Sequence, residues 1–268
     1  MVVSRQVGLL SRDPDSVRSW LKVLRPWVKI WHRSEVRGLK YVPDGPSLIV
    51  SNHSGGLFTM DWPVFAVAFA ERFGAERPFY LLSHNIIFES PVGDALRRVG
   101  LVPATREGAR TVLDSGAALM VFPGGDYDVG RPTSKRNVID FDGRTGYVTT
   151  AMEAGAPIVP MVSIGGHENQ LYLFHGKRLA RLTGLRKATR MAVLPISFGL
   201  PFGPSLMMLA PVNAPLPTKI VTQVLPPIDI SAEFGDDADP KVVDAHVRKV
   251  MQAALDDLAR KRRFPVIG

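Results

Sequence analysis

The chain has 268 residues, of which 46% are hydrophobic and 22% are charged, a balance typical of a folded domain and unlike that of a disordered chain. It contains no cysteine, which excludes a disulfide-stabilised fold, a thiolate metal site and a cysteine nucleophile. Lys and Arg number 33 against 25 Asp and Glu, so the formal net charge is +8. Such an excess favours an anionic partner: nucleic acid, an anionic membrane or a phosphorylated small molecule.

Residues 15–33 are predicted to form a helix with two distinct faces, bent at Pro26. Its apolar side chains recur at helical spacing along one face, and its basic side chains form a second stripe. The apolar positions are Val17, Trp20, Leu21, Leu24, Trp27, Val28 and Trp31, and the basic positions are Arg18, Lys22, Arg25, Lys29 and Arg33. Tryptophan opposite Lys and Arg is typical of helices in a membrane interface. A helix packed on its domain with a solvated basic face has the same pattern, so both interpretations stay open.

Short apolar strands alternate with helices from residue 47 to residue 263. Strands are expected at 47–51, 79–83, 118–122, 158–164 and 219–224. Helices are expected at 63–73, 107–114, 145–154 and, beginning at Asp239 and Pro240, up to about residue 263. Continuous apolar strands separated by helices indicate an α/β fold, with a mixed, largely parallel sheet flanked by helices on both faces.

Residues 191–218 carry no formal charge and are numerous enough to cross a bilayer. Six prolines and two glycines interrupt them, which is incompatible with one continuous helix. We expect an irregular apolar segment that is either buried or inserted into a membrane surface.

Three polar or glycine-rich clusters follow predicted strands, at residues 52–56, 123–126 and 165–169. Ligands of open α/β sheets bind beyond the carboxyl ends of strands, so these clusters are candidate site segments. His53 lies in the first cluster, where a neutral imidazole could act as a general base. Asp61 follows eight residues later and could fix the orientation of the ring. Taken alone, this pair is equally compatible with a histidine whose hydrogen bonds are purely structural.

The residues around this pair resemble a known family. The sequence NHSGGLFTMD at Asn52–Asp61 resembles the first motif of the glycerolipid acyltransferases, the lysophosphatidate acyltransferase superfamily, in which Asn-His is followed by a catalytic Asp. Leu101–Glu107 (LVPATRE), Val121–Gly125 (VFPGG) and Gly155–Met161 (GAPIVPM) are similar to its second, third and fourth motifs, in the same order. Arg144–Asn169 is similar to the corresponding stretch of the monoacylglycerol and diacylglycerol acyltransferase branch.

The resemblance implies an acyl-CoA-dependent O-acyltransferase that acts on a hydroxyl of a glycerolipid, either a lysophospholipid or a mono- or diacylglycerol. His53 would be the general base, and Asp61 would stabilise the imidazolium that forms. Backbone N–H groups of the glycine-rich loops would bind the developing oxyanion. No metal and no cofactor are expected, because acyl-CoA is a co-substrate and no metal-ligand spacing is present.

The same resemblance implies which residues bind substrates. The expected substrate-binding residues are Asn52, Gly55, Gly56, Arg106, Pro123, Gly124, Gly125, Asp126, Arg144, His167 and Glu168. Four basic residues, Arg131, Lys135, Arg136 and Arg144, are candidates for the phosphates of coenzyme A, although a run of basic residues is also typical of a solvated face. For Arg106, a surface ion pair with a neighbouring acid is the alternative.

Two departures from the family pattern affect the expected chemistry. Seven residues separate His53 from Asp61, where most of the superfamily has four. Either the longer loop still brings Asp61 to the ring, or Asp126 or Asp128 takes its place. Gly124 stands where the third motif usually has a Glu that helps to bind the acceptor, as in the Pro-Gly-Gly of the neutral-lipid branch. The loss of that carboxylate favours a neutral or bulkier acceptor over a glycerol phosphate.

On this basis we expect an N-terminal membrane-associating helix at 1–34 and an acyltransferase domain at 35–268, at the cytoplasmic face of a membrane. The expected partners are acyl-CoA, a lipid acceptor and the membrane surface, and no nucleic acid, because the basic residues match no recognised module. The main alternative is a catalytically inactive lipid-binding or membrane-binding protein on the same scaffold. A serine hydrolase is disfavoured because there is no Gly-x-Ser-x-Gly elbow.

Overall fold

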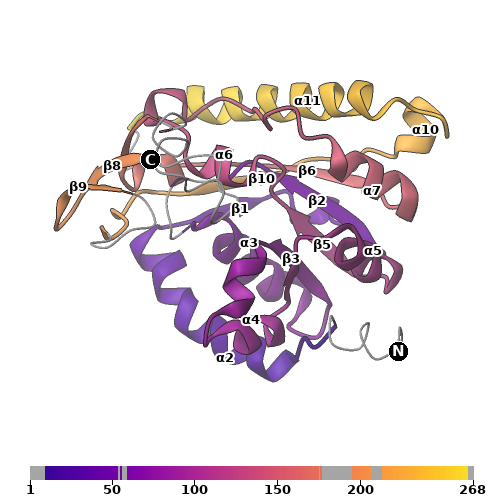
Figure 1. Cartoon of the computed structure of the whole chain (residues 1–268), viewed down its shortest axis with the longest axis horizontal. Helices are drawn as coiled ribbons and strands as arrows, with labels where there is room; N and C mark the ends of the chain where they lie inside the picture. Colours follow the sequence, from indigo (N-terminus) through magenta and orange to yellow (C-terminus); the bar gives the residue numbers. More distant parts are fainter. Residues whose placement is uncertain are drawn as a thin grey trace.

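The computed structural model describes residues 10–53, 55, 59–174, 176, 195–206 and 213–264. Its centre is a seven-stranded sheet (Figure 1). In spatial order the strands are β1 (Glu35–Arg37), β10 (Val221–Val224), β6 (Ile158–Ile164), β2 (Ser47–Ser51), β5 (Ala118–Val121), β3 (Phe79–Ser83) and β4 (Leu101–Pro103). The five strands from β6 to β4 are parallel, and β10 runs antiparallel to β6. The predicted mixed, largely parallel sheet is therefore confirmed.

Helices cover both faces of the sheet (Figure 1). On one face lie α5 (Arg106–Asp114), α7 (Gly146–Ala154) and the long α11 (Pro240–Lys261). On the other face lie α2 (Pro14–Pro26), α3 (Asp61–Phe73) and α4 (Gly93–Arg98). Alternate residues of a strand point to opposite faces, and β2 shows this directly: Leu48 and Val50 belong to the α11-side core, and Ile49 to the α3-side core.

The remaining elements are short, and most of them connect strands and helices. They are the helices α6 (Gly125–Val129) and α10 (Ile230–Phe234) and the 3₁₀ turns η2 (Leu39–Tyr41), η3 (Asn85–Glu89), η4 (Thr133–Lys135) and η5 (Gly166–Glu168). In the parts of the chain that the structure describes, no helix combines the length and the hydropathy needed to cross a membrane.

The predicted N-terminal helix is present as α2, which continues into a π-helical turn, η1 (Trp27–Trp31). Asp13 caps it by accepting a hydrogen bond from the N–H of Ser16 at 2.9 Å. One part of its apolar face packs against α3, where Val17, Leu21 and Val28 are buried with Val64 and Val67. A second set of apolar side chains faces solvent; these are Val23, Trp27, Ile30 and Trp31.

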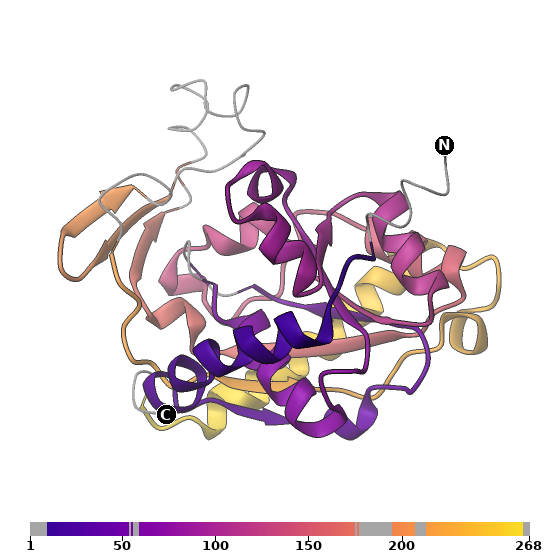
Figure 2. The same ribbon diagram turned by 90° about the horizontal axis from the view of Figure 1, so that it is seen from below.

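A small antiparallel sheet lies beside the main one and consists of β7 (Leu171–Phe174), β8 (Ile196–Gly199) and β9 (Gly203–Leu206). The expectation of an irregular segment at 191–218 is wrong for β8 and β9, because the two strands pair in register as an antiparallel hairpin. Residues 191–194 and 207–212 of that segment lie outside the described residues. Figure 2 shows this sheet at the same end of the molecule as the last turn of α2–η1.

The α11 side of the core makes the fold sensitive to single deletions. Leu255 of α11 is fully buried against the sheet. We predict that Leu255→Ala lowers the free energy of unfolding by about 2–5 kcal/mol, because the truncation leaves a cavity in a closely packed core. Urea unfolding will show this as a lower midpoint at an unchanged slope. Val242→Ala, at an exposed position of the same helix, should change stability by less than about 0.5 kcal/mol; equal losses in both variants would refute the prediction.

Candidate active site

Three of the parallel strands deliver the three polar clusters to one edge of the sheet. Strands β6, β2 and β5 are adjacent, and all three run in the same direction. The segments that follow them therefore meet beyond their carboxyl ends, the position at which open α/β sheets bind ligands.

His53 lies two residues beyond the end of β2, among the polar groups that converge at this edge. Its Nδ1 lies 3.1 Å from Oδ2 of Asp61, the first residue of α3; the side chains are 14% and 1% exposed. The longer loop thus still brings Asp61 to the ring. Because an ionised carboxylate only accepts hydrogen bonds, Nδ1 carries the proton and Nε2 keeps its lone pair. The face of the ring stacks on Phe122, with centroids 4.0 Å apart and planes at 11°.

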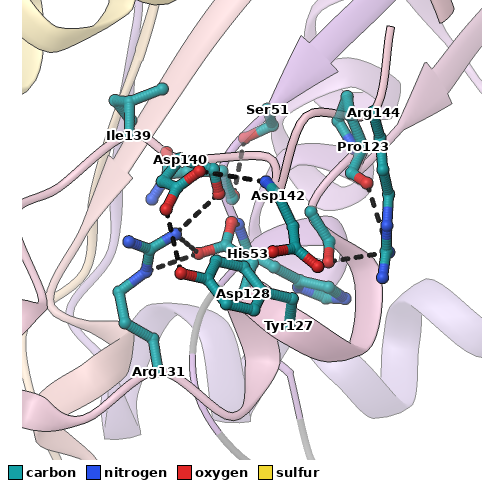
Figure 3. Close-up of polar contacts among 12 residues, drawn as sticks. Ser51, His53, Pro123, Tyr127, Asp128, Arg131, Ile139, Asp140, Asp142 and Arg144 are labelled. Carbon is teal, nitrogen blue, oxygen red and sulfur yellow. Dashed lines mark hydrogen bonds and ion pairs between the residues drawn. The ribbon is translucent and has the colours of Figure 1, made fainter. Parts of the chain in front are cut away.

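Asp128, one of the two alternative partners, contacts His53 through the backbone instead of the ring. Its Oδ2 accepts a hydrogen bond from the His53 N–H at 2.7 Å, and its Oδ1 accepts one from Nε of Arg131 at 2.9 Å (Figure 3). Both side chains are 2% exposed. Burial raises the pKa of the Asp128 carboxyl, and the adjacent Arg131 opposes that shift.

Arg131 is fixed from every side by internal contacts. Its Nη2 donates to the backbone carbonyl of Asp140 at 2.8 Å, and its guanidinium lies over the ring of Tyr127, 5.6 Å from the centroid. The Tyr127 hydroxyl in turn donates to the Asp140 carboxylate at 2.9 Å. Arg131 therefore has no accessible guanidinium for a phosphate of coenzyme A, and the expectation that it binds one is wrong. A run of basic residues in the sequence does not indicate which of them is buried against a carboxylate, as Arg131 is against Asp128.

The Pro-Gly-Gly turn after β5 is held by Arg144. Nη1 of Arg144 donates to the carbonyl of Gly124 at 3.0 Å, and Nη2 pairs with Asp126 at 2.8 Å (Figure 3). A side chain at position 124 would not fit, because an added Cβ would lie 2.6 Å from Cβ of Asp128. Gly125 adopts a positive φ of 46°, which favours glycine. These contacts join five predicted site residues into one unit beside His53. They are Pro123, whose carbonyl also faces Arg144, together with Gly124, Gly125, Asp126 and Arg144 itself.

Asn52 joins the ends of two strands. Its side-chain amide donates to the Ser163 carbonyl at 2.9 Å, and its Oδ1 accepts from the Ser163 N–H at 2.8 Å. Gly55 is buried in close contact with its surroundings, since an added Cβ would lie 2.4 Å from Cε2 of Tyr172 and 2.9 Å from Nδ1 of His167. Gly56 lies outside the described residues.

The third cluster contributes one neutral and one paired side chain. His167 is almost fully buried, and burial lowers its pKa to about 4, so the ring is neutral near pH 7. Glu168 is also buried, and its Oε1 lies 3.0 Å from Nε of Arg136 and 2.8 Å from Nη1 of Arg262. Glu168 therefore anchors the chain just beyond α11, a structural contact that the sequence pattern did not reveal.

Arg106 is the one described candidate that is not part of the cluster around His53. It begins α5, is largely exposed and pairs with Glu153 at 3.4 Å, as the alternative interpretation had it. Its strand, β4, is separated from β2 by β5 and β3. Within the described residues, no group of three or more His, Asp or Glu side chains is arranged to hold a metal ion.

Comparison with known proteins places the chain in a family. Residues 33–164 match the family described as Acyltransferase. The chain belongs to this family, within the glycerolipid acyltransferase superfamily that its motifs resemble.

Several relatives extend the match over most of the chain. An uncharacterized protein of Mycobacterium tuberculosis is 34% identical over 253 residues, which cover 92% of this chain and 67% of that protein. A mouse protein described as a DGAT1/2-independent enzyme synthesizing storage lipids is 26% identical over 87% of this chain and 68% of its own length. The crystal structure of the 1-acyl-sn-glycerophosphate acyltransferase PlsC from Thermotoga maritima shares the fold, with a TM-score of 0.54 at 18% identity over 94% of this chain and 85% of that chain.

The buried neutral His167 predicts a pH-dependent stability. Its pKa falls from 6.5 to about 4 on folding, so the unfolded chain binds a proton that the folded chain does not between these values. Stability should therefore be fully present above pH 6.5 and decline by up to about 1.4 kcal/mol per pH unit as the pH falls toward 4. Urea unfolding between these pH values should show a shallower decline for His167→Gln. Part of the decline should remain in this variant, because burial also lowers the pKa of His32. His84→Gln, at an exposed position, should follow the wild type; an unchanged slope in His167→Gln would contradict the assignment.

Proposed function

We propose that this protein is an acyl-CoA-dependent O-acyltransferase that transfers a fatty acyl group to a hydroxyl of a glycerolipid. The observation that supports catalysis most strongly is the 3.1 Å contact between His53 and Asp61 beside the ends of three parallel strands. It supports an enzyme over a catalytically inactive lipid-binding protein, because the longer loop does not separate Asp61 from the His53 ring.

In the proposed reaction, Nε2 of His53 takes the proton of the acceptor hydroxyl as its oxygen attacks the thioester carbonyl. Asp61 stabilises the imidazolium, and backbone N–H groups of the glycine-rich loops stabilise the oxyanion. Collapse of the tetrahedral intermediate breaks the carbon–sulfur bond, and His53 returns the proton to the leaving thiolate. No acyl-enzyme forms, in keeping with a chain that lacks cysteine and a nucleophile elbow.

The acceptor is proposed to be a neutral glycerolipid, such as a mono- or diacylglycerol. Gly124 removes the acidic side chain of the third motif, and the close approach of Asp128 leaves no space for one. The printed name of the mouse relative, a storage-lipid enzyme, supports the same class. For the phosphates of coenzyme A, the candidates are Lys135, Arg136 and Arg144, which are exposed or half-buried near the site.

Lipid substrates require access to a membrane, and we assign this role to the exposed apolar side chains at one end of the molecule. They come from α2–η1 and from the β8–β9 hairpin, and they are Val23, Trp27, Ile30, Trp31, Phe198, Leu200 and Phe202. Trp31 contacts the segment beside the hairpin: its Nε1 donates to the carbonyl of Pro215 at 3.0 Å, and the adjacent Ala214 forms a β-bridge with Leu200. Exposed Lys22, Arg25 and Lys29 would add attraction to the anionic phospholipids of a cytoplasmic leaflet.

The acceptor class and the role of His53 can be tested together. Purified protein is supplied with a long-chain acyl-CoA and, in turn, monoacylglycerol, diacylglycerol and lysophosphatidate, and thiol release is measured. We expect release with a neutral acceptor to exceed release with lysophosphatidate, and His53→Ala to reduce it by about 10³-fold or more. His84→Ala, at an exposed histidine, should retain full activity. Absence of release above the His53→Ala level with every acceptor would refute the proposed function.

Membrane docking is tested with vesicles. Ile30 is 75% exposed, and burying such a side chain in an interface contributes enough that Ile30→Glu should weaken binding to anionic phospholipid vesicles about tenfold or more. Cosedimentation measures the bound fraction. Val242→Glu places the same charge at an exposed position of α11, on the opposite face of the sheet, and should bind like the wild type (Figure 1). Equal binding by Ile30→Glu and the wild type would exclude this surface.

A further inference from the structure

The backbone of His53 is fixed independently of its ring. Strand β2 ends at Ser51, so the N–H of His53 has no partner strand. The Asp128 carboxylate supplies the acceptor at 2.7 Å. The Asp61 carboxylate and the Phe122 ring then contact the imidazole itself. His53 is thus held by α6, by α3 and by the end of β5.

The carboxylate that holds this N–H is an unusual one to bury. Asp128 and Arg131 are each 2% exposed, and removal of two charges from water is unfavourable unless they are paired and hydrogen-bonded. Here each has further partners: Asp128 accepts from His53, and Arg131 donates to the carbonyl of Asp140. The turn before the pair is shaped around it, because a Cβ at Gly124 would collide with Asp128. The cluster is a connected set of hydrogen bonds and ion pairs that ends at His53 (Figure 3).

We propose that Asp128, held by Arg131, is a positioning residue that orients the His53 backbone so that the imidazole meets Asp61 and presents Nε2 to the acceptor. The inference rests on the proposed function for its catalytic consequence, but its geometric content stands by itself. Asp128 is thus an acidic residue of the third-motif region, but its carboxylate contacts the backbone of His53. The Glu usual in that motif would instead face the acceptor.

The charge of Asp128 has a second effect. Four ionisable groups face His53 or its immediate neighbours: Asp61 from α3, Asp128 from α6, Arg131 just after α6, and His167 from η5. His167 is neutral near pH 7, so Arg131 is the one cation of these four. Removal of the negative charge of Asp128 would leave Arg131 uncompensated within this cluster and would weaken the hydrogen bond to the His53 N–H, which a carboxylate accepts more strongly than an amide.

The experiment combines nuclear magnetic resonance with kinetics on the full-length chain. In the wild type, the His53 amide should exchange slowly with solvent and resonate downfield, as expected for an N–H bound to a carboxylate. In Asp128→Asn, the His53 amide signal should move, because a neutral amide oxygen accepts this hydrogen bond less strongly than a carboxylate does. With an accepted acyl acceptor, kcat should fall about 100-fold, with KM within about threefold of the wild-type value.

Asp244→Asn is the matched control. Asp244 is a buried carboxylate on α11 that accepts from the Tyr147 hydroxyl at 2.9 Å and pairs with Arg248 at 2.8 Å, without contact to His53. The same substitution there should lower stability but leave the His53 amide signal and kcat unchanged. Equal effects of both variants on His53 would reduce Asp128 to a general structural role and overturn the inference.

Two outcomes keep the test decisive. If Asp128→Asn does not fold, the wild-type measurement decides: rapid exchange of the His53 amide, at the rate of an unbonded N–H, overturns the inference. If the wild type shows the expected amide signal but transfers no acyl group to any acceptor, the proposed function fails while the positioning contact stands.

Discussion

In the proposed mechanism, the hydrogen bond between Nδ1 of His53 and the Asp61 carboxylate is the contact on which catalysis depends. The two groups come from different elements, the end of β2 and the start of α3, so their 3.1 Å separation is a product of the fold. Helix α3 is fixed by buried side chains on two sides, with Phe65 and Phe69 against the sheet and Val64 against α2. Core packing therefore determines whether a base and its orienting acid meet.

The site around this contact is charged but internally balanced. The positive charges of Arg131, Arg136 and Arg144 are each paired with a carboxylate of the same edge, and His167 is kept neutral by burial. Such fixed charges and dipoles do not need to reorganise when an imidazolium forms, which is the main source of electrostatic catalysis in proteins. The net charge of +8 is thus expressed mostly outside this cluster.

Much of the fold could be predicted from the sequence, because apolar patterning is local. Strands β2, β3 and β6 have the expected bounds, and α11 begins after Asp239 as its capping residues indicate. The three-residue strand β1 was missed because it has too few residues to show a period. The β8–β9 hairpin was missed because prolines and glycines, which exclude a helix, do not by themselves reveal strand pairing.

The parts of the site that could be predicted are the residues that belong to sequence motifs. The His53–Asp61 pair follows from the family resemblance, and the structure brings the two together. The contact made by Asp128 could not be predicted, because its carboxylate accepts a hydrogen bond from a backbone N–H. Any carboxylate buried at that place could accept it, so the contact leaves no motif in the sequence. The burial of Arg131 depends on long-range packing in the same way.

The most direct test of the account is the turnover number of Asp61→Asn, a variant that keeps the size of the side chain but lacks its charge. If Asp61 orients His53 and stabilises its imidazolium, kcat falls about 10³- to 10⁴-fold while KM for acyl-CoA stays within about threefold of the wild-type value. A variant that keeps more than about a tenth of the wild-type turnover would contradict the central claim.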